Sequence, residues 1–321
     1  MKEENAMADT PRKPYIVGMG AANLDEHWQS LAPVNLRDSN PGRCTLSVGG
    51  VTRNICENLA RLGMRVSLLS EIGDDVRGET IVRVSEEAGI DMSHVDRKKG
   101  AASSSYVAVL DEKGDMLLGL SDMRIIRGME TDYAEQNADL IRGAAAVVCD
   151  GSLPLPVMAR LLELASGPCF LDPASIAYAK NAEPLADGFA CIKPNRFELE
   201  ILSGRKVGTG ADMEAAVDAL LQRGTGAVAV SLGARGCYYA DKNGTRLCRA
   251  LPPLETMADA TGAGDAFTAG LVYGTVNGFD LTRTLDTALA AGRIAAESTL
   301  TVSPEMSREN IENTLTLCAE K

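Results

Sequence analysis

Short apolar runs alternate with amphipathic stretches along most of the chain. The apolar runs predict strands, and they cover residues 15–19, 65–69, 145–149, 169–171, 190–192 and 227–231. Helical patterns follow several of them, as at 54–62, 155–165 and 213–223. This alternation is typical of βαβ units, so we expect an α/β fold with a doubly wound, mostly parallel sheet flanked by helices.

Two segments break this rhythm. Residues 35–48 and 103–120 have the pattern of extended antiparallel strands, and a turn signal lies at 111–114. Two hairpin-like inserts in a βαβ chain predict a small β lid beside the sheet. Since the chain shows no internal repeat or long linker, residues 15–321 are expected to form one domain that carries this lid, after a polar, mobile leader at 1–14.

The charge balance narrows the class of partner. The chain has 321 residues, 45% of them hydrophobic, and its 32 Lys and Arg against 44 Asp and Glu give a formal net charge of −12. This acidic balance disfavours a nucleic-acid partner, because such binding depends on clustered cations. A small anionic ligand stays compatible with it, since a helix N-terminus and a single local cation can hold one.

The cysteine and histidine content narrows the kinds of catalytic and metal sites that the chain can be expected to contain. Eight cysteines are scattered without a C-x-x-C pair, and no secretory signal precedes them, so we expect reduced thiols and a cytoplasmic location. His27 and His94 are the only histidines, which disfavours a Cys-His nucleophile, a Ser-His-Asp triad and a His-rich zinc site. No apolar run approaches transmembrane length, so no membrane partner is expected.

The segment richest in candidate chemistry is 259–267, which reads D-A-T-G-A-G-D-A-F. Gly262, Ala263 and Gly264 stand at a predicted loop-to-helix junction, where unpaired N–H groups and the helix dipole favour an anion. Asp265 would repel a resident phosphate, so it fits better as a base that takes a proton from an attacking hydroxyl. The alternative is a carboxylate that only complements the helix dipole, and the spacing alone leaves both open.

A second glycine cluster opens the segment 49–63. Gly49 and Gly50 would let the backbone come close to a ligand, and Asn54 follows one turn into the next helix, able to donate and accept hydrogen bonds. Taken alone, the same pattern favours a plain turn before an amphipathic helix that ends at Gly63.

Further candidates follow predicted strands, where ligands of open α/β sheets gather. Asn195 and Glu198 could hold water-bound Mg²⁺ or simply cap a helix. Asn23 and Asp25 are expected to project past the first strand and bind a polyhydroxyl ligand. Residues 231–236 form either a turn beside a nucleotide phosphate or a plain βα turn. The Gly-x-Gly at 18–20 is weak evidence for a dinucleotide, because no clear helix follows it.

In this order, the segments resemble the PfkB (ribokinase-like) family of carbohydrate and nucleoside kinases, from residue 15 to about residue 306. The resemblance rests on 49–63 and 259–267, with Asn195-x-x-Glu198 between them. It implies a ribokinase-like domain with a β lid. Ala260 is one departure, since many members carry threonine there. Phosphoryl transfer needs positioning and charge stabilisation more than covalent help, which suits a chain poor in histidine.

The resemblance also implies roles for the candidate residues. They are Asp265 as general base; Gly262, Ala263 and Gly264 as anion hole; Asn195, Ser231, Gly233 and Gly236 along ATP; Glu198 for Mg²⁺ through water; and Asp259 and Thr261 for a monovalent cation such as K⁺. A substrate would contact Asn23, Asp25, Ser39, Gly49, Gly50 and Asn54.

The substrate class follows from a departure in the first motif. Ribokinase-type members read G-G-K-G-A-N-Q-A, whereas this chain reads G-G-V-T-R-N at 49–54 and S-N-P-G at 39–42. Both features are similar to those of the members that phosphorylate pseudouridine. The resemblance thus implies that ATP and pseudouridine give pseudouridine 5′-phosphate and ADP, under a lid around Ser39 and 103–106. Exposed strand edges in the lid favour a homodimer.

Three alternatives remain at this stage. The chain could be a family kinase for ribose, a ketohexose derivative or another nucleoside. It could instead be a non-catalytic sugar-binding regulator, although the joint presence of Asp265, the 262–264 loop and Glu198 disfavours that. A dehydrogenase built on the 18–20 glycines is the weakest alternative, and a lack of NAD(H) binding would exclude it.

Overall fold

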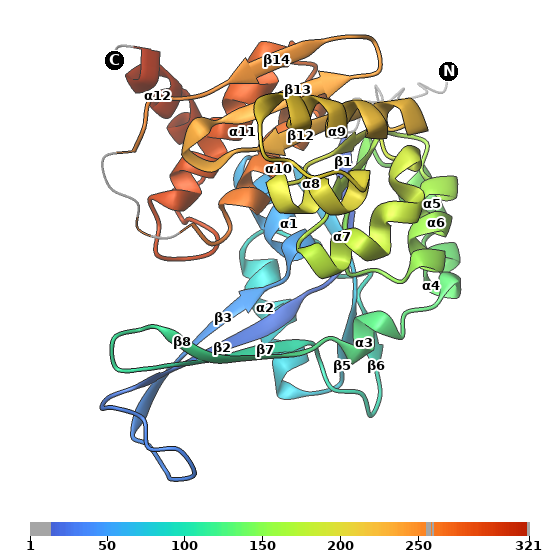
Figure 1. Cartoon of the computed structure of the whole chain (residues 1–321). Helices are drawn as coiled ribbons and strands as arrows, with labels where there is room; N and C mark the ends of the chain where they lie inside the picture. The colour runs from blue at the N-terminus through green and yellow to red at the C-terminus, as the bar shows by residue number, and fades with distance from the viewer. Residues whose placement is uncertain (1–13, 255–257, 259, 320–321) are drawn as a thin grey trace, which may run out of the picture.

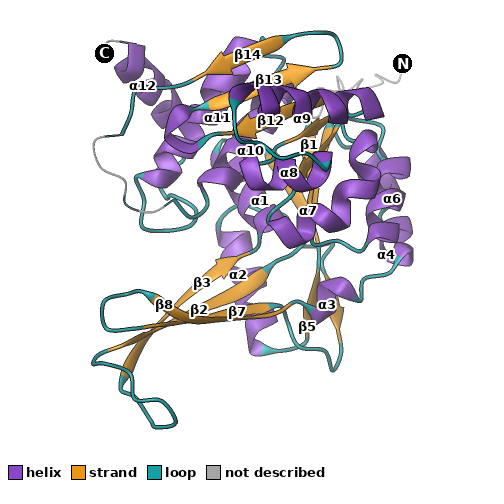
Figure 2. Ribbon diagram, viewed as in Figure 1, coloured by secondary structure: helices purple, strands orange, loops and turns teal. Residues whose placement is uncertain are grey.

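The computed structural model describes residues 14–254, 258 and 260–319. Its centre is an eight-stranded sheet that confirms the predicted doubly wound, mostly parallel arrangement (Figures 1 and 2). In spatial order the strands are β4 (Arg65–Leu69), β1 (Tyr15–Met19), β9 (Ala146–Asp150), β10 (Cys169–Asp172), β11 (Cys191–Ile192) and β12 (Ala227–Ser231), all parallel, then the antiparallel β13 (Cys237–Asp241) and β14 (Arg246–Arg249). The leader predicted at 1–14 lies, except for Pro14, outside the described residues.

Helices cover both faces of the sheet, which explains why its inner strands are continuous apolar runs. One core contains residues of α1 (Val51–Arg61), α2 (Val76–Glu87), α10 (Ala263–Val276), α11 (Leu281–Ala296) and α12 (Arg308–Ala319). The other contains residues of α3 (Arg124–Arg127), α4 (Thr131–Gln136), α5 (Ala138–Arg142), α6 (Leu155–Leu164), α7 (Ile176–Ala182), α8 (Arg196–Ser203) and α9 (Gly210–Arg223). Two 3₁₀ turns, η1 (Glu183–Gly188) and η2 (Gly233–Arg235), complete the chain's helical elements among the described residues.

Small residues hold α10 tightly against α11. A methyl group at Gly270 would come within 2.5 Å of the Ala288 Cα, and one at Gly274 within 2.8 Å of Thr284. Such close contact leaves α10 little freedom to shift, because neighbouring backbone would have to move with it. The body of α10, whose first turn carries Asp265, is therefore packed closely against α11.

A second, four-stranded sheet forms the lid, which extends away from the central sheet in Figure 1. Its order is β3 (Gly42–Gly49), β2 (Asn23–Ser30), β7 (Ser105–Leu110) and β8 (Met116–Asp122), and a short pair, β5 (Glu71–Gly73) with β6 (Asp96–Lys98), forms a separate two-stranded sheet. The extended segment expected from residue 35 begins only at Gly42. Asn23 and Asp25 lie beyond the end of β1, inside the strand β2, which was not predicted.

None of the helices in the described part of the chain combines the length and apolarity that a bilayer crossing requires.

Candidate active site

Asp265 is the third residue of α10, directly after the predicted anion-hole residues. Gly262 caps this helix with φ of 79°, in the region that favours glycine, and a side chain there would overlap the Thr301 carbonyl oxygen. This turn lets the chain enter α10 with its first N–H groups unpaired by the helix itself. Partial positive charge therefore gathers beside the Asp265 carboxyl.

The Asp265 carboxyl is poised to exchange a proton. Asn54 Nδ2 donates a hydrogen bond to its Oδ2 at 2.9 Å. Loss of hydration, followed by the charge of Asp172, raises the pKa of Asp265 to about 8, while Asn54 and Lys193 oppose that rise. A carboxyl with a pKa near the working pH can both accept and release a proton, as a general base must.

Two buried carboxylates at strand ends face this group, and their oxygens are already occupied. Asp150 ends β9 and accepts from the Thr52 backbone N–H at 3.2 Å and from Thr52 Oγ1 at 2.6 Å. Asp172 ends β10 and accepts from Thr268 Oγ1 at 2.8 Å. These donors hold both carboxylates in place, and the charges of Asp172 and Asp150 act on Asp265.

Lys193 places a buried cation beside Asp172 and Gly264. Its side chain is 7% exposed, its Nζ pairs with Asp172 Oδ2 at 2.9 Å, and it lies 3.0 Å from the position of a Cβ on Gly264. Burial would lower the pKa of Lys193, but the charges of Asp172 and Glu198 outweigh it and raise that pKa, so the ammonium stays charged. Sequence reasoning gave this lysine no role, although it directly follows a predicted strand.

The proposed substrate side collects around the root of the lid. Asn23 Nδ2 donates to Asp25 Oδ1, and a side chain on Gly49 would overlap the other Asp25 oxygen. Gly50 has φ of 103° and passes so close to the Ala21 carbonyl that no side chain fits. Burial raises the pKa of Asp25 to about 6, against the opposing effect of Asn23. With Asn54 just after these glycines, five of the six predicted substrate residues come together.

Ser39 is the exception and corrects the sequence-based expectation. In the β2–β3 pair, Asn23 lies opposite Gly49 and Ser30 opposite Gly42. The loop that carries Ser39 therefore joins the far ends of these strands, about 23 Å along the strand from Asn23. Contact between Ser39 and a substrate at Asp25 would require movement of the lid or a second subunit.

The predicted ATP side lies where β11 and β12 end. Asn195 and Glu198 form a complete helix cap on α8: Asn195 Oδ1 accepts from the Glu198 N–H at 3.0 Å, and the Asn195 N–H donates to Glu198 Oε2 at 2.8 Å. This cap uses one Glu198 oxygen and does not need the other. Ser231 pairs with Asn195 in a parallel bridge, so these two candidates are direct neighbours.

The turn after β12 has its own structural demands. Gly233 has φ of 60° and no atom within 4 Å of the position of a Cβ, which leaves its surface open. Gly236 has φ of 83°, and a side chain there would overlap the Arg249 carbonyl oxygen. The turn therefore requires glycine at Gly236 whether or not a nucleotide lies beside it.

The family model of pfkB family carbohydrate kinases matches residues 23–308 of this chain. The chain belongs to this family. A pseudouridine kinase of Escherichia coli is 32% identical over 301 residues, which cover 93% of this chain and 96% of the relative. A putative sugar kinase from Clostridium perfringens superposes with a TM-score of 0.85 at 32% identity, covering 95% of this chain and 96% of that one. The ribokinase of Arabidopsis thaliana, solved with ribose and ATP, has a TM-score of 0.82 at 20% identity over 94% and 99% of the two chains and shares the fold.

As a pfkB family kinase, the protein is a phosphotransferase for a carbohydrate or nucleoside. Such kinases use ATP, typically with Mg²⁺. The residues that the structure describes contain no group of three or more His, Cys, Asp or Glu side chains arranged to hold a metal ion.

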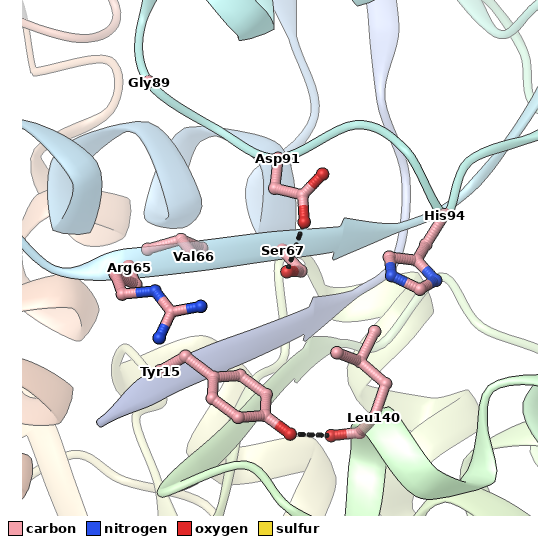
Figure 3. Close-up of a pocket in the computed structure, with 8 residues that line it drawn as sticks. All are labelled: Tyr15, Arg65, Val66, Ser67, Gly89, Asp91, His94 and Leu140. Atoms are coloured by element: carbon pink, nitrogen blue, oxygen red, sulfur yellow. Dashed lines mark hydrogen bonds between the residues drawn. The ribbon is translucent and has the colours of Figure 1, made fainter. Parts of the chain in front are cut away.

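A separate cavity of about 500 Å³ lies at the other end of the sheet from Asp265. It is lined by residues at the start of β1 and β4, among them Tyr15 and Arg65, and by Asp91 and His94 (Figure 3). In Figure 3 the Arg65 guanidinium lies over the Tyr15 ring, and Asp91 accepts a hydrogen bond from Ser67. None of the lining residues belongs to the predicted kinase site.

Proposed function

We propose that this kinase transfers the γ-phosphoryl group of ATP to the 5′-hydroxyl of pseudouridine. The observation that carries the proposal is the hydrogen bond from Asn54 to Asp265, which joins the G-G-V-T-R-N motif to the base at the start of α10. Similarity to a pseudouridine kinase over 93% of the chain supports the choice of nucleoside.

In the proposed reaction, Asp25 and Asn54 bind ribose hydroxyls, and the 5′-hydroxyl lies against Asp265. The O5′–P bond forms while the bond between the γ-phosphorus and the bridging β–γ oxygen breaks, and the 5′-hydroxyl proton moves to Asp265. The N–H groups at 262–264 and the Lys193 ammonium stabilise the charge on the transferred group. ADP leaves with the bridging oxygen.

The remaining contacts are assigned to the ATP side. Asn195 and Ser231, which are direct neighbours, would contact the nucleotide together with Gly233 and Gly236, and Glu198 would hold Mg²⁺ through water. Mg²⁺ supplies charge neutralisation of the phosphates. Thr261 belongs to a proposed K⁺ site, whereas its expected partner Asp259 lies outside the described residues. We place the reaction in the cytoplasm, where ATP is available and eight free cysteines stay thiols.

The substrate assignment is tested by ADP release with Mg-ATP and a panel of pseudouridine, uridine, adenosine, ribose and fructose 6-phosphate. We expect the highest kcat/KM for pseudouridine. Faster turnover of another acceptor would replace the substrate and keep the phosphoryl-transfer site. Silence across the panel would favour the sugar-binding regulator.

We further propose that the lid forms a homodimer. The strand register places Trp28 in one row with Leu118, and Leu46 in one row with Leu120, so all four side chains share one lid face. All four are exposed, and β3 and β8 are the edges of the lid sheet. An exposed apolar face beside free strand edges favours pairing with a second copy.

Leu120→Asp is therefore expected to convert a dimer into a monomer, because it places a carboxylate among the exposed apolar side chains of this lid face. Sedimentation velocity at micromolar concentration measures the mass. The matched control is Leu317→Asp, since Leu317 is similarly exposed on α12, outside the lid. A wild-type chain that sediments as a monomer would contradict the proposal, and so would a Leu120→Asp variant that stays dimeric.

A further inference from the structure

Arg53 is a buried cation in the first helix of the site, and none of the roles above uses it. Its side chain is 2% exposed, and it lies among α1, the lid strand β3 and α2. Nε donates to Ser85 Oγ at 3.1 Å, and Nη1 reaches both the Val48 carbonyl and Asn54 Oδ1 at 3.4 Å. Its counter-ion is Glu57, one turn along the same helix.

Arg53 stays buried at a cost. Burial lowers its pKa, against the opposing charge of Glu57, and Nη2 is buried with no hydrogen-bond partner among the described residues. A well-packed apolar side chain often serves stability as well as a buried ion pair does. The contacts of the guanidinium therefore point to a task other than packing.

The hydrogen bonds of the Asn54 amide indicate what the contact with Arg53 does. The amide carries one acceptor, Oδ1, and one donor group, Nδ2, whereas a guanidinium can only donate. With Nη1 of Arg53 on Oδ1, Nδ2 is left to face the Asp265 carboxylate. The flipped amide would set donor against donor at Arg53 and acceptor against carboxylate at Asp265.

The same guanidinium also fixes the root of the lid. Val48 directly precedes Gly49 and Gly50, and its carbonyl accepts from the Nη1 group that contacts Asn54. The Arg53 guanidinium thus links the end of β3 to the Asn54 side chain, which in turn contacts Asp265.

We propose that Arg53 is a positioning residue that orients the Asn54 amide toward Asp265 and ties this orientation to the lid root, without touching the substrate. The inference rests on the proposed role of Asp265 as base. Four groups act on Asp265 from the elements around it: Asn54 from α1, Asp150 from β9, Asp172 from β10 and Lys193 after β11. Arg53 controls the first of these.

The test is the pH profile of kcat/KM for the best acceptor of the panel. In Arg53→Met the acidic limb is expected to move up by about one pH unit, because a hydrogen bond that favours the carboxylate is lost. The matched control is Ser85→Ala, which removes the Nε partner and leaves the Asn54 contact; its limb should stay at the wild-type pH. In an Asn54→Ala background, Arg53→Met should cause no further shift.

An unmoved limb in Arg53→Met, or an equal shift in Ser85→Ala, would overturn the inference. If Arg53→Met does not fold, the pH profile of Arg53→Lys is measured instead. A single ammonium cannot reproduce the forked contacts of the guanidinium, so a smaller shift of the acidic limb in the same direction is expected. An unshifted limb in Arg53→Lys would then overturn the inference. Failure of the base assignment looks different, because the acidic limb would then persist in Asp265→Asn.

Discussion

Asp265→Asn is expected to lower kcat by about 10²–10⁴-fold while ATP and the nucleoside still bind. Asparagine keeps the size of the side chain and can still contact Asn54, but it cannot accept the 5′-hydroxyl proton. Steady-state ADP release gives kcat, and equilibrium titration with each substrate gives affinity. A variant with near wild-type kcat would refute the base assignment.

The pH dependence of the wild type has a defined direction. Burial and Asp172 raise the pKa of Asp265 to about 8, so its carboxyl is expected to lose its proton at a much higher pH than an exposed aspartate does. Activity is expected to rise with pH as this proton leaves, and Asp265→Asn should lack that limb. The matched control is Asp218→Asn, which removes a half-exposed carboxylate paired with Arg246 and should keep the wild-type profile.

The thermal stability of Asp265→Asn shows whether its activity is lost because the carboxylate is missing or because the fold is damaged. Because the folded-state pKa of Asp265 is raised from 3.8 to about 8, the folded protein binds this proton more tightly than the unfolded chain. The contribution of the carboxyl to stability therefore falls as pH rises through this range. Asp265→Asn removes that dependence, so its Tm at pH 8 should be no lower than that of the wild type.

The central strands could be predicted from sequence because both of their faces are covered. Residues 15–19 and 227–231 coincide with β1 and β12, since full burial turns a strand into an uninterrupted apolar run. The lid strand β2, Asn23–Ser30, escaped prediction because it is rich in polar residues and borders solvent. Its pairing with β3 is what carries the Ser39 loop to the far end of the lid.

The proposed base and the proposed anion hole are local in sequence, so one glycine-rich segment was enough to suggest both. Asp150, Asp172 and Lys193 are not local. Each is a single polar residue at a strand end, and only the adjacency of β9, β10 and β11 brings the three together. Strand order depends on tertiary packing, so spacing along the chain cannot reveal such a cluster.

Lys193→Met is expected to lower kcat by about 10²–10³-fold, the usual effect of removing one group that stabilises transition-state charge. The ammonium lies beside Gly264 in the proposed anion hole, so its charge acts where the phosphoryl group is transferred. The single variant also strands the buried Asp172 carboxylate, which destabilises a fold by about 3–5 kcal/mol. Loss of activity alone would therefore be ambiguous.

The double variant Lys193→Met with Asp172→Asn resolves this ambiguity. It removes both charges, and the asparagine can still accept from Thr268 Oγ1, which contacts Asp172 at 2.8 Å. Thermal unfolding should show recovered stability, while ADP release stays as low as in the single variant. If turnover recovers together with stability, Lys193 serves only as the partner of Asp172, and the charge on the transferred group is stabilised by the N–H groups of α10 alone.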